Sequence, residues 1–241
     1  MKYDLFDDGV GSVEYISHMG NDLSIVNAAR VSFGVEKKEV DEKDKKLINY
    51  LMQHNHTSPF EHCAITLRFT VPLFIRSQHH RHRTWSYNEI SRRYTSVDMK
   101  FYEPSGFRSQ HRSNRQASTS EMVNPDLNGE YHSLVPITPY YASDAVKAHN
   151  QKSLALYNTL VDSGVCREQA RGVLPQNLYT EYYGTTNLHN LLKFVNLRLH
   201  EGAQWEIQEV AKACLSVAFQ YFPEATRSYI QKHNIEIGEI S

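Results

Sequence analysis

The residues best suited to chemistry gather in one short basic segment, residues 76–94. Arginine side chains bind phosphate and carboxylate groups through paired hydrogen bonds. The segment holds five arginines and three histidines against one acidic residue, and it contains no lysine. The arginines are Arg76, Arg81, Arg83, Arg92 and Arg93, and the histidines are His79, His80 and His82. Because the chain of 241 residues has a formal net charge of −1, this local excess predicts a site for an anionic ligand.

Two alternatives to an anion site remain open for this segment. Most charge runs are solvated surface. Arginines interleaved with aromatic side chains, here Trp85, Tyr87 and Tyr94, also bind single-stranded nucleic acid. A net charge of −1 gives the whole chain no general attraction to nucleic acid or to a membrane surface, so any basic function must be local.

Metal and classical nucleotide sites have weaker support. His54, His56, Glu61 and His62 are close in sequence, and histidine with carboxylate can bind a metal. They do not form the H-E-x-x-H helix pattern, however, and we expect no metal. The sequence also lacks both common glycine-rich phosphate loops, which argues against a Rossmann or P-loop nucleotide site.

The cysteines and the N-terminus indicate the compartment. Cys63, Cys166 and Cys214 are far apart and form no C-x-x-C pair, a pattern typical of a reduced protein without a zinc–thiolate site. No apolar run approaches the ~20 residues of a membrane span, and the first residues lack the layout of a signal peptide. We therefore expect a cytoplasmic protein.

The elements that must position the basic segment follow from hydrophobic periodicity. Alternating apolar residues predict a strand over 63–71, followed by a helix over 72–82 with Pro72 in its first turn. The remaining expected elements are a strand region at 1–20, helices at 21–33, 41–53, 143–163, 166–174, 188–201, 204–221 and 224–233, and a strand at 178–186. Asn21 or Asp22, Asp41 and Ser143 are the expected N-caps. Residues 103–141 read as an irregular loop. Together these predict an α+β fold, a single helix-rich domain over 1–241 around one modest sheet.

The basic segment resembles the signature of the flavin-dependent thymidylate synthases. Residues 81–93 read R-H-R-T-W-S-Y-N-E-I-S-R-R, which meets the family pattern R-H-R-x(7)-S and its wider form R-H-R-x-x-S-x-N-x-x-S-x-R. Further stretches resemble family blocks in the same order: 19–32, 56–62, 167–175 and 196–207. Such a series indicates membership of the family rather than a single shared motif.

The resemblance implies a fold, a reaction and an assembly. The fold would be that of the thymidylate synthase-complementing proteins. The reaction would convert dUMP to dTMP, with 5,10-methylenetetrahydrofolate as the one-carbon donor and FAD, reduced by NADPH, as the hydride source. The chain would form a homotetramer with shared active sites, with no membrane or nucleic-acid partner. A relative that acts on a modified pyrimidine nucleotide, or a nucleic-acid-binding module, remains the alternative.

The same resemblance implies roles for individual residues. For the flavin it implies Ser58, Glu61, Arg81, His82, Arg83, Glu89, Asn187, Leu188, His189 and Lys193. For dUMP it implies Gln78, His79, His80, Arg81, Glu89, Ile90, Ser91, Arg92, Arg93, Arg171 and Arg198. Fragments of the 103–141 loop, such as Phe107-Arg108 and Asn114-Arg115-Gln116, resemble a loop of many family members that we expect beside the site.

Two residues of this set have a reaction role to consider. Arg198 borders the buried stripe of its predicted helix, just after Phe194 and Val195. A guanidinium there can hold the uracil ring as an N3-deprotonated anion and so raise electron density at C5, and we expect Arg198 to be the catalytic side chain. Ser91 is a possible nucleophile, but a hydroxyl needs a neighbouring base, and none is evident. Ligand binding is therefore the preferred role for Ser91.

Overall fold

The computed structural model describes residues 1–115, 117–127 and 140–236. It divides into two compact units. Unit 1 comprises Met1–Thr70, Ser77–Asn88 and Glu181–Ser241, and unit 2 comprises Val71–Arg76 and Glu89–Thr180. Within the described ranges, no helix is long and apolar enough to cross a bilayer.

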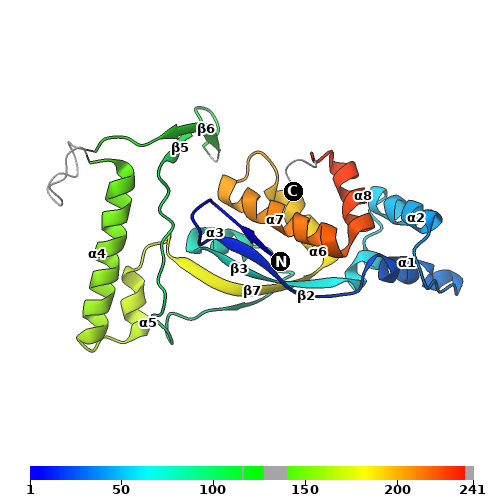
Figure 1. The fold of residues 1–241 in the computed structure, drawn as a ribbon, viewed down its shortest axis with the longest axis horizontal. Coiled ribbons are helices and arrows are strands. Elements are labelled where there is room, and N and C mark those ends of the chain that lie inside the picture. Colours follow the sequence, from blue (N-terminus) through cyan, green and yellow to red (C-terminus); the bar gives the residue numbers. More distant parts are fainter. Residues whose placement is uncertain (116, 128–139, 237–241) are drawn as a thin grey trace. The chain divides into compact units, whose positions relative to one another are not determined.

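A five-stranded sheet with the order β1-β2-β3-β7-β4 is the main sheet of the fold (Figure 1). Its strands are β1 Lys2–Asp4, β2 Ser12–Met19, β3 Ala64–Pro72, β7 Tyr179–Asn187 and β4 Ser86–Glu89. β2 pairs antiparallel with both β1 and β3. Along β3, Ile65, Leu67, Phe69 and Val71 are buried and their neighbours only half-buried, which confirms the alternation predicted from the sequence.

Helices complete unit 1 around this sheet. They are α1 Asp22–Arg30, α2 Glu42–Gln53, α6 Leu188–Arg198, α7 Trp205–Tyr221 and α8 Pro223–His233, together with the short 3-10 turns η1 Val31–Phe33 and η2 Ser58–His62. α7 packs on β2 and α6, and α8 packs on α2. The long buried face of α7, from Ile207 to Ala218, is the centre of the apolar core. The predicted helices at 21–33, 41–53, 204–221 and 224–233 are confirmed.

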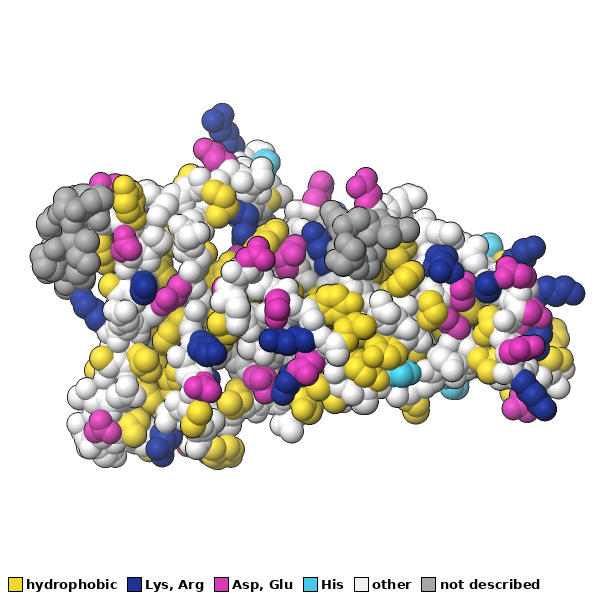
Figure 2. Space-filling view, viewed as in Figure 1, with side chains coloured by type: hydrophobic (Ala, Val, Ile, Leu, Met, Phe, Trp, Pro, Cys, Tyr) yellow, Lys and Arg dark blue, Asp and Glu magenta, His cyan; other side chains and the backbone are white. Residues whose placement is uncertain are grey.

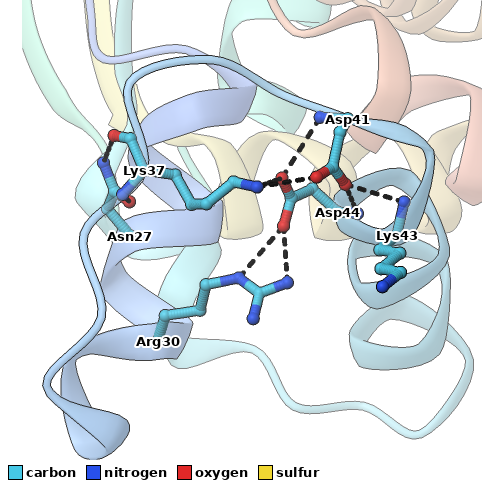
Figure 3. A network of polar contacts seen from close by, with 6 residues as sticks. All are labelled: Asn27, Arg30, Lys37, Asp41, Lys43 and Asp44. Atoms are coloured by element: carbon cyan, nitrogen blue, oxygen red, sulfur yellow. Dashed lines mark hydrogen bonds and ion pairs between the residues drawn. The ribbon is translucent and has the colours of Figure 1, made fainter.

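A closed polar network joins α1 to α2 (Figure 3). Asp41 caps α2 as predicted, accepting from the backbone N–H groups of Lys43 and Asp44. The Asp44 side chain is buried and accepts from Arg30 at 2.6 Å, and Lys37 lies 3.4 Å away. Burial raises the pKa of the Asp44 carboxyl, but the hydrogen bonds from the Asp41 backbone, Arg30 and Lys37 outweigh it and hold that pKa below its usual value.

Unit 2 holds a two-stranded sheet and three helical segments. β5 Phe107–Gln110 pairs antiparallel with β6 Ser118–Val123, and α4 Ala142–Asp162 precedes α5 Arg167–Ala170 and the 3-10 turn η3 Arg171–Val173. The loop predicted over 103–141 is therefore wrong where β5 and β6 form. Most residues of these strands are polar and none is fully buried, so their composition resembles that of a loop. Gln116 and residues 128–139 lie outside the described residues.

Some predicted boundaries are also wrong. Pro72 ends β3 instead of starting a helix, and α3 runs only over Leu73–His79. Beyond α3 the backbone turns, because the His82 N–H donates to the His79 carbonyl at 2.9 Å. β4 was not predicted, since a four-residue strand gives too little periodicity. α6 ends at Arg198 rather than at 201.

Two further element boundaries differ from the predictions. α4 begins after Tyr141 instead of after Ser143. Asn124 from outside the helix bonds both the Ser143 N–H (3.0 Å) and its hydroxyl (2.9 Å), so the capping group is supplied from a distant segment. The strand predicted over 178–186 is confirmed as β7, shifted by one residue.

Candidate active site

The turn that follows α3 carries the central residues of the basic segment. Arg198, the last residue of α6, reaches this turn from 116 positions away in the chain. Its Nε donates to His82 Nε2 at 3.0 Å, and its Nη2 donates to the Gln78 carbonyl at 3.2 Å. Gln78 is also fixed, since its side-chain amide donates to Gln204 at 2.6 Å. The structure thus brings Arg198, a candidate substrate residue, together with Gln78 and with His82, a candidate flavin residue.

His82 is a neutral hydrogen-bond acceptor in this arrangement. Burial, followed by the positive charges of Arg198 and Lys193, lowers its pKa to about 4. A neutral imidazole can accept from Arg198 through Nε2 only as the tautomer protonated at Nδ1. Burial also lowers the pKa of Arg198, but a guanidinium stays charged. The cation is therefore oriented by two neutral acceptors and keeps its full charge for a ligand.

His79 anchors the start of the turn through buried contacts. Its side chain is fully buried, and its Nδ1 pairs with the Tyr182 hydroxyl at 2.8 Å. Its ring lies edge-on to Phe69 and Trp85, with centroids 4.7 and 4.6 Å away. Burial holds the pKa of His79 well below its usual value. These contacts anchor the His79 imidazole within unit 1, and the assignment of His79 to the substrate site stays a prediction.

Arg81 and Arg83 point the turn's positive charge outward. Both side chains are exposed. Within the ranges that the structure describes, neither guanidinium has a hydrogen-bond or ion-pair partner. Two unpaired arginines within three residues can donate to a diphosphate or a similar anion. This observation fits the pyrophosphate of a flavin dinucleotide, which needs cationic donors of this kind.

The other candidate flavin residues of unit 1 lie on η2 and at the start of α6. The Leu188 N–H donates to the Cys63 carbonyl at 2.8 Å, which holds the start of α6 against the end of η2. Asn187 caps α6 by accepting from the Asn190 N–H at 2.9 Å. Ser58 and Glu61 on η2 are exposed. The structure therefore places these two groups on neighbouring elements.

A cavity of about 210 Å³ opens beside these elements. His189 and Lys193, both candidate flavin residues, line it together with apolar side chains such as Phe60 and Leu192. Its lining contains no acidic residue among those that the structure describes. A basic rim over an apolar floor suits an aromatic group that carries negative charge.

Unit 2 holds the remaining candidates, and here the arginines are paired. Glu89 accepts from Arg76 Nε at 3.0 Å and from the Thr180 hydroxyl at 2.7 Å. Arg93 pairs with the Glu168 carboxylate at 3.3 Å, and Arg171 Nε donates to the Glu168 carbonyl at 3.3 Å. Glu168 therefore draws together two arginines that are 78 positions apart in the numbering.

Ser91, Ile90 and Arg92 complete the unit 2 group. The Ser91 hydroxyl accepts from the Arg93 N–H at 3.3 Å, and the Ser91 carbonyl accepts from the Tyr94 N–H at 3.0 Å. Arg92 donates to the Val97 carbonyl at 2.8 Å. Ile90 is 38% exposed. These contacts shape a turn, and in the described part of unit 2 they bring no histidine or carboxylate to Ser91 as a base.

Several side chains at the site were missed by the sequence analysis. The buried Tyr182 bonds the His79 ring and the half-buried Tyr87 bonds the His79 carbonyl, and their spacing carries no signal that would single out their hydroxyls. Among the described residues, no group of three or more His, Cys, Asp or Glu side chains could hold a metal ion.

The space-filling view bears on the nucleic-acid alternative for the basic segment. On the face drawn in Figure 2, basic and acidic side chains are interspersed rather than gathered by sign. The end of that view occupied by α1 and α2 shows both colours side by side. A face of this kind is unlike the continuous basic stripe that a nucleic-acid backbone requires.

Comparisons with known proteins agree with one another. The family model described as thymidylate synthase complementing protein matches residues 14–224. A flavin-dependent thymidylate synthase of Thermus thermophilus is 41% identical over 226 residues, which cover 94% of this chain and 77% of that protein. The enzyme of the same name from Thermotoga neapolitana is 39% identical, covering 96% and 95%.

A solved structure gives the same answer for the fold. The UMP/dUMP methylase PolB from Streptomyces cacaoi, bound with 5-Br dUMP, superposes with a TM-score of 0.76 at 30% identity, covering 95% of this chain and 97% of that one. The mixed fold with a small sheet, expected from the sequence, is therefore confirmed. The chain belongs to the thymidylate synthase complementing protein family, the flavin-dependent thymidylate synthases.

Proposed function

We propose that this chain methylates dUMP to dTMP in dTMP biosynthesis, using FAD, NADPH and 5,10-methylenetetrahydrofolate. The observation that carries the proposal is the turn after α3, where Arg81 and Arg83 have no partner among the described residues while Arg198 is fixed by His82 and Gln78. Unpaired, exposed guanidiniums on an anchored turn suit the several anionic groups of these ligands.

The cofactor supplies the redox chemistry and the protein supplies orientation and charge. When bound, FAD carries the hydride of NADPH, so the methylene carbon becomes a methyl group and the folate leaves as tetrahydrofolate. Arg81 and Arg83 hold the pyrophosphate. Ser58, Glu61, Asn187, His189 and Lys193 hold the rest of the flavin.

Arg198 acts on the uracil ring. Its guanidinium has five N–H donors, and two of its nitrogens are engaged by His82 and Gln78. Its remaining donors hold the ring as an N3-deprotonated anion, which raises electron density at C5, where the new carbon bond forms. This electrostatic role needs no covalent nucleophile, in keeping with a Ser91 that has no base in the described part of unit 2.

The unit 2 arginines bind the nucleotide phosphate. Arg93, Arg171 and the Ser91 hydroxyl are the donors, and the phosphate displaces Glu168 from Arg93. The Arg93–Glu168 pair is half-exposed and so costs little to break.

The assembly and the compartment are parts of the same proposal. We infer a homotetramer with shared active sites, as the resemblance to the family implies. The three cysteines are unpaired in the structure, which supports action in the reducing cytoplasm.

The test uses the purified chain loaded with FAD. Addition of dUMP, methylenetetrahydrofolate and NADPH should give dTMP, detected by chromatography, with loss of NADPH absorbance in equal amount. Omission of any one substrate should stop dTMP formation. A flavin-loaded protein that oxidises NADPH but forms no dTMP would reject the proposal.

A second substrate is supported by the structural comparison. PolB, the solved relative at 30% identity, is described as a methylase of both UMP and dUMP. The same assay with UMP in place of dUMP decides between a strict deoxyribonucleotide enzyme and one that accepts both sugars.

A further inference from the structure

The two unpaired arginines of the turn depend on the backbone for their position. Arg81 and Arg83 have no side-chain partner among the described residues, so no contact of their own holds them, and the backbone of residues 79–83 sets the positions from which their side chains extend. The groups that anchor this backbone therefore set the geometry of the anion site.

Tyr87 is one such anchor. Its hydroxyl lies 2.9 Å from the His79 carbonyl and 3.1 Å from the His82 carbonyl and can donate to either. His79 is the last residue of α3, and carbonyls at a helix C-terminus lack an intrahelical partner. The Tyr87 hydroxyl therefore lies within hydrogen-bond distance of a carbonyl at each end of the turn, and Arg81 lies between these two residues in the sequence.

The Tyr87 ring is itself held in place. It stacks on the His80 ring, with centroids 4.0 Å apart and planes at 27°. It also meets the His79 ring edge-on at 5.3 Å. Burial raises the pKa of the Tyr87 hydroxyl above its usual value, so the phenol stays protonated and donates at any working pH.

Arg198 is the complementary anchor. It fastens the Gln78 carbonyl and the His82 ring from α6, whereas Tyr87 fastens the carbonyls of His79 and His82 from β4. Arg198 is also a proposed ligand contact, so a substitution there would change both the position of the turn and the binding of the uracil ring. In the part of the chain that the structure describes, the Tyr87 hydroxyl bonds only carbonyls of the turn, so its removal tests the position of the turn without removing a proposed ligand contact.

We propose that Tyr87 is a positioning residue that clamps the turn at His79 and His82 and thereby presents Arg81 and Arg83 to the bound anion. The identity of that anion as FAD rests on the proposed function. The clamp itself rests only on the contacts of Tyr87.

The test is Tyr87→Phe, which keeps the stacked ring and removes only the hydroxyl. One lost hydrogen bond of ordinary strength predicts FAD binding weaker by about fivefold, measured by flavin fluorescence at a temperature where the variant is fully folded. At saturating FAD, kcat should stay within about twofold, because Tyr87 does not touch the reacting atoms. The matched control is Tyr157→Phe, since the Tyr157 hydroxyl is buried without a hydrogen-bond partner in the described ranges.

A second measurement needs no ligand. In hydrogen–deuterium exchange, the peptide covering residues 79–84 should exchange faster in Tyr87→Phe than in wild type or in Tyr157→Phe. A purely structural role would lower the melting temperature yet leave FAD affinity and this peptide unchanged, and that result overturns the inference. Wild type that fails to bind FAD would reject the proposed function, while the exchange result still decides on the clamp.

Discussion

Two arginines of unit 1 are held in opposite ways. Arg30 on α1 pairs with the buried carboxylate of Asp44, inside a network where Lys37 and Asp41 balance the remaining charge (Figure 3). Arg198 on α6 is held by an imidazole and a backbone carbonyl, both of them neutral. The first arginine has its counter-charge inside the protein, and the second has none there among the described residues.

This difference in partners distinguishes Arg30, which stabilises the fold, from Arg198, which is available to bind a ligand. A cation paired with a buried carboxylate cannot attract a ligand without leaving that carboxylate unpaired, which is costly. A cation oriented by neutral acceptors keeps its charge and its geometry for an incoming anion. The same reasoning extends to Arg81 and Arg83, which have no internal partner in the described part of the chain.

The largest effect is expected from Arg198→Ala. Removal of a preorganised donor at a developing charge lowers kcat by about 10²–10³-fold. Because Arg198 is assigned to the uracil ring and not to the flavin, the variant should retain FAD, with flavin absorbance close to wild type. dTMP formation near the wild-type rate would reject the catalytic role.

Asp44→Ala should act on stability instead of chemistry. Loss of the buried carboxylate leaves Arg30 without its partner among the described residues and Lys37 with Asp41 alone, at a cost of about 2–3 kcal/mol in the free energy of unfolding. Their side chains are each 28% exposed, which moderates the cost through solvation. Denaturant unfolding measures the loss. A variant of normal stability with impaired FAD binding would show that the α1–α2 network serves ligand binding and not stability, which would contradict the account.

The two regions should also differ in pH dependence. The folded-state pKa of His82, about 4, lies below the value of about 6.5 for an unfolded histidine. The unfolded chain therefore takes up the proton first, and stability falls as pH drops from about 6.5 to about 4. The Asp44 carboxyl has a lowered pKa, so its contribution is present above about pH 4 and is lost only below it.

His82→Gln tests the upper part of that range. Glutamine can accept from Arg198 but does not titrate, so the slope of unfolding free energy against pH should flatten between about 6.5 and 4. His79, whose pKa is also lowered, should keep part of the slope. An unchanged slope would show that the pKa of His82 is the same in the folded and unfolded chains, which would contradict the lowered value on which its role as a neutral acceptor rests.

Glu168→Gln is expected to have the smallest effect. It frees Arg93 from a half-exposed pair that is worth at most about 1 kcal/mol. The affinity for dUMP, measured by calorimetry, should rise by less than about fivefold. A loss of about tenfold or more would mean that Glu168 itself contacts the nucleotide.

The sequence predicted the features that depend on residues close together in the chain. The alternation at Ile65, Leu67 and Phe69 is a strand signal in itself, and the Asn21 and Asp41 caps are confirmed with their hydrogen bonds. The candidate site could be approached from residues 76–94 because so many arginines in one segment of a neutral chain are unusual. Arg198 was placed at the edge of its buried stripe, where the structure has it half-buried.

The rest depends on contacts between distant segments. The bond from Arg198 to His82 joins positions 116 apart, and no pattern in either segment records it. The Tyr87 clamp requires the backbone to turn after His79, which helix periodicity through residue 82 did not predict. β5 and β6 were missed because most of their residues are polar and none is fully buried, so pairing, rather than burial, defines them.

The central claim is that the unpaired arginines of the turn hold the flavin and the paired arginine of the α1–α2 network does not. The most direct test compares the FAD dissociation constants of Arg83→Ala and Arg30→Ala in one equilibrium binding assay at a temperature where both are folded. Loss of a charge-assisted contact predicts at least about tenfold weaker FAD binding for Arg83→Ala, with wild-type affinity for Arg30→Ala. Wild-type affinity in Arg83→Ala, or a comparable loss in Arg30→Ala, would contradict the account.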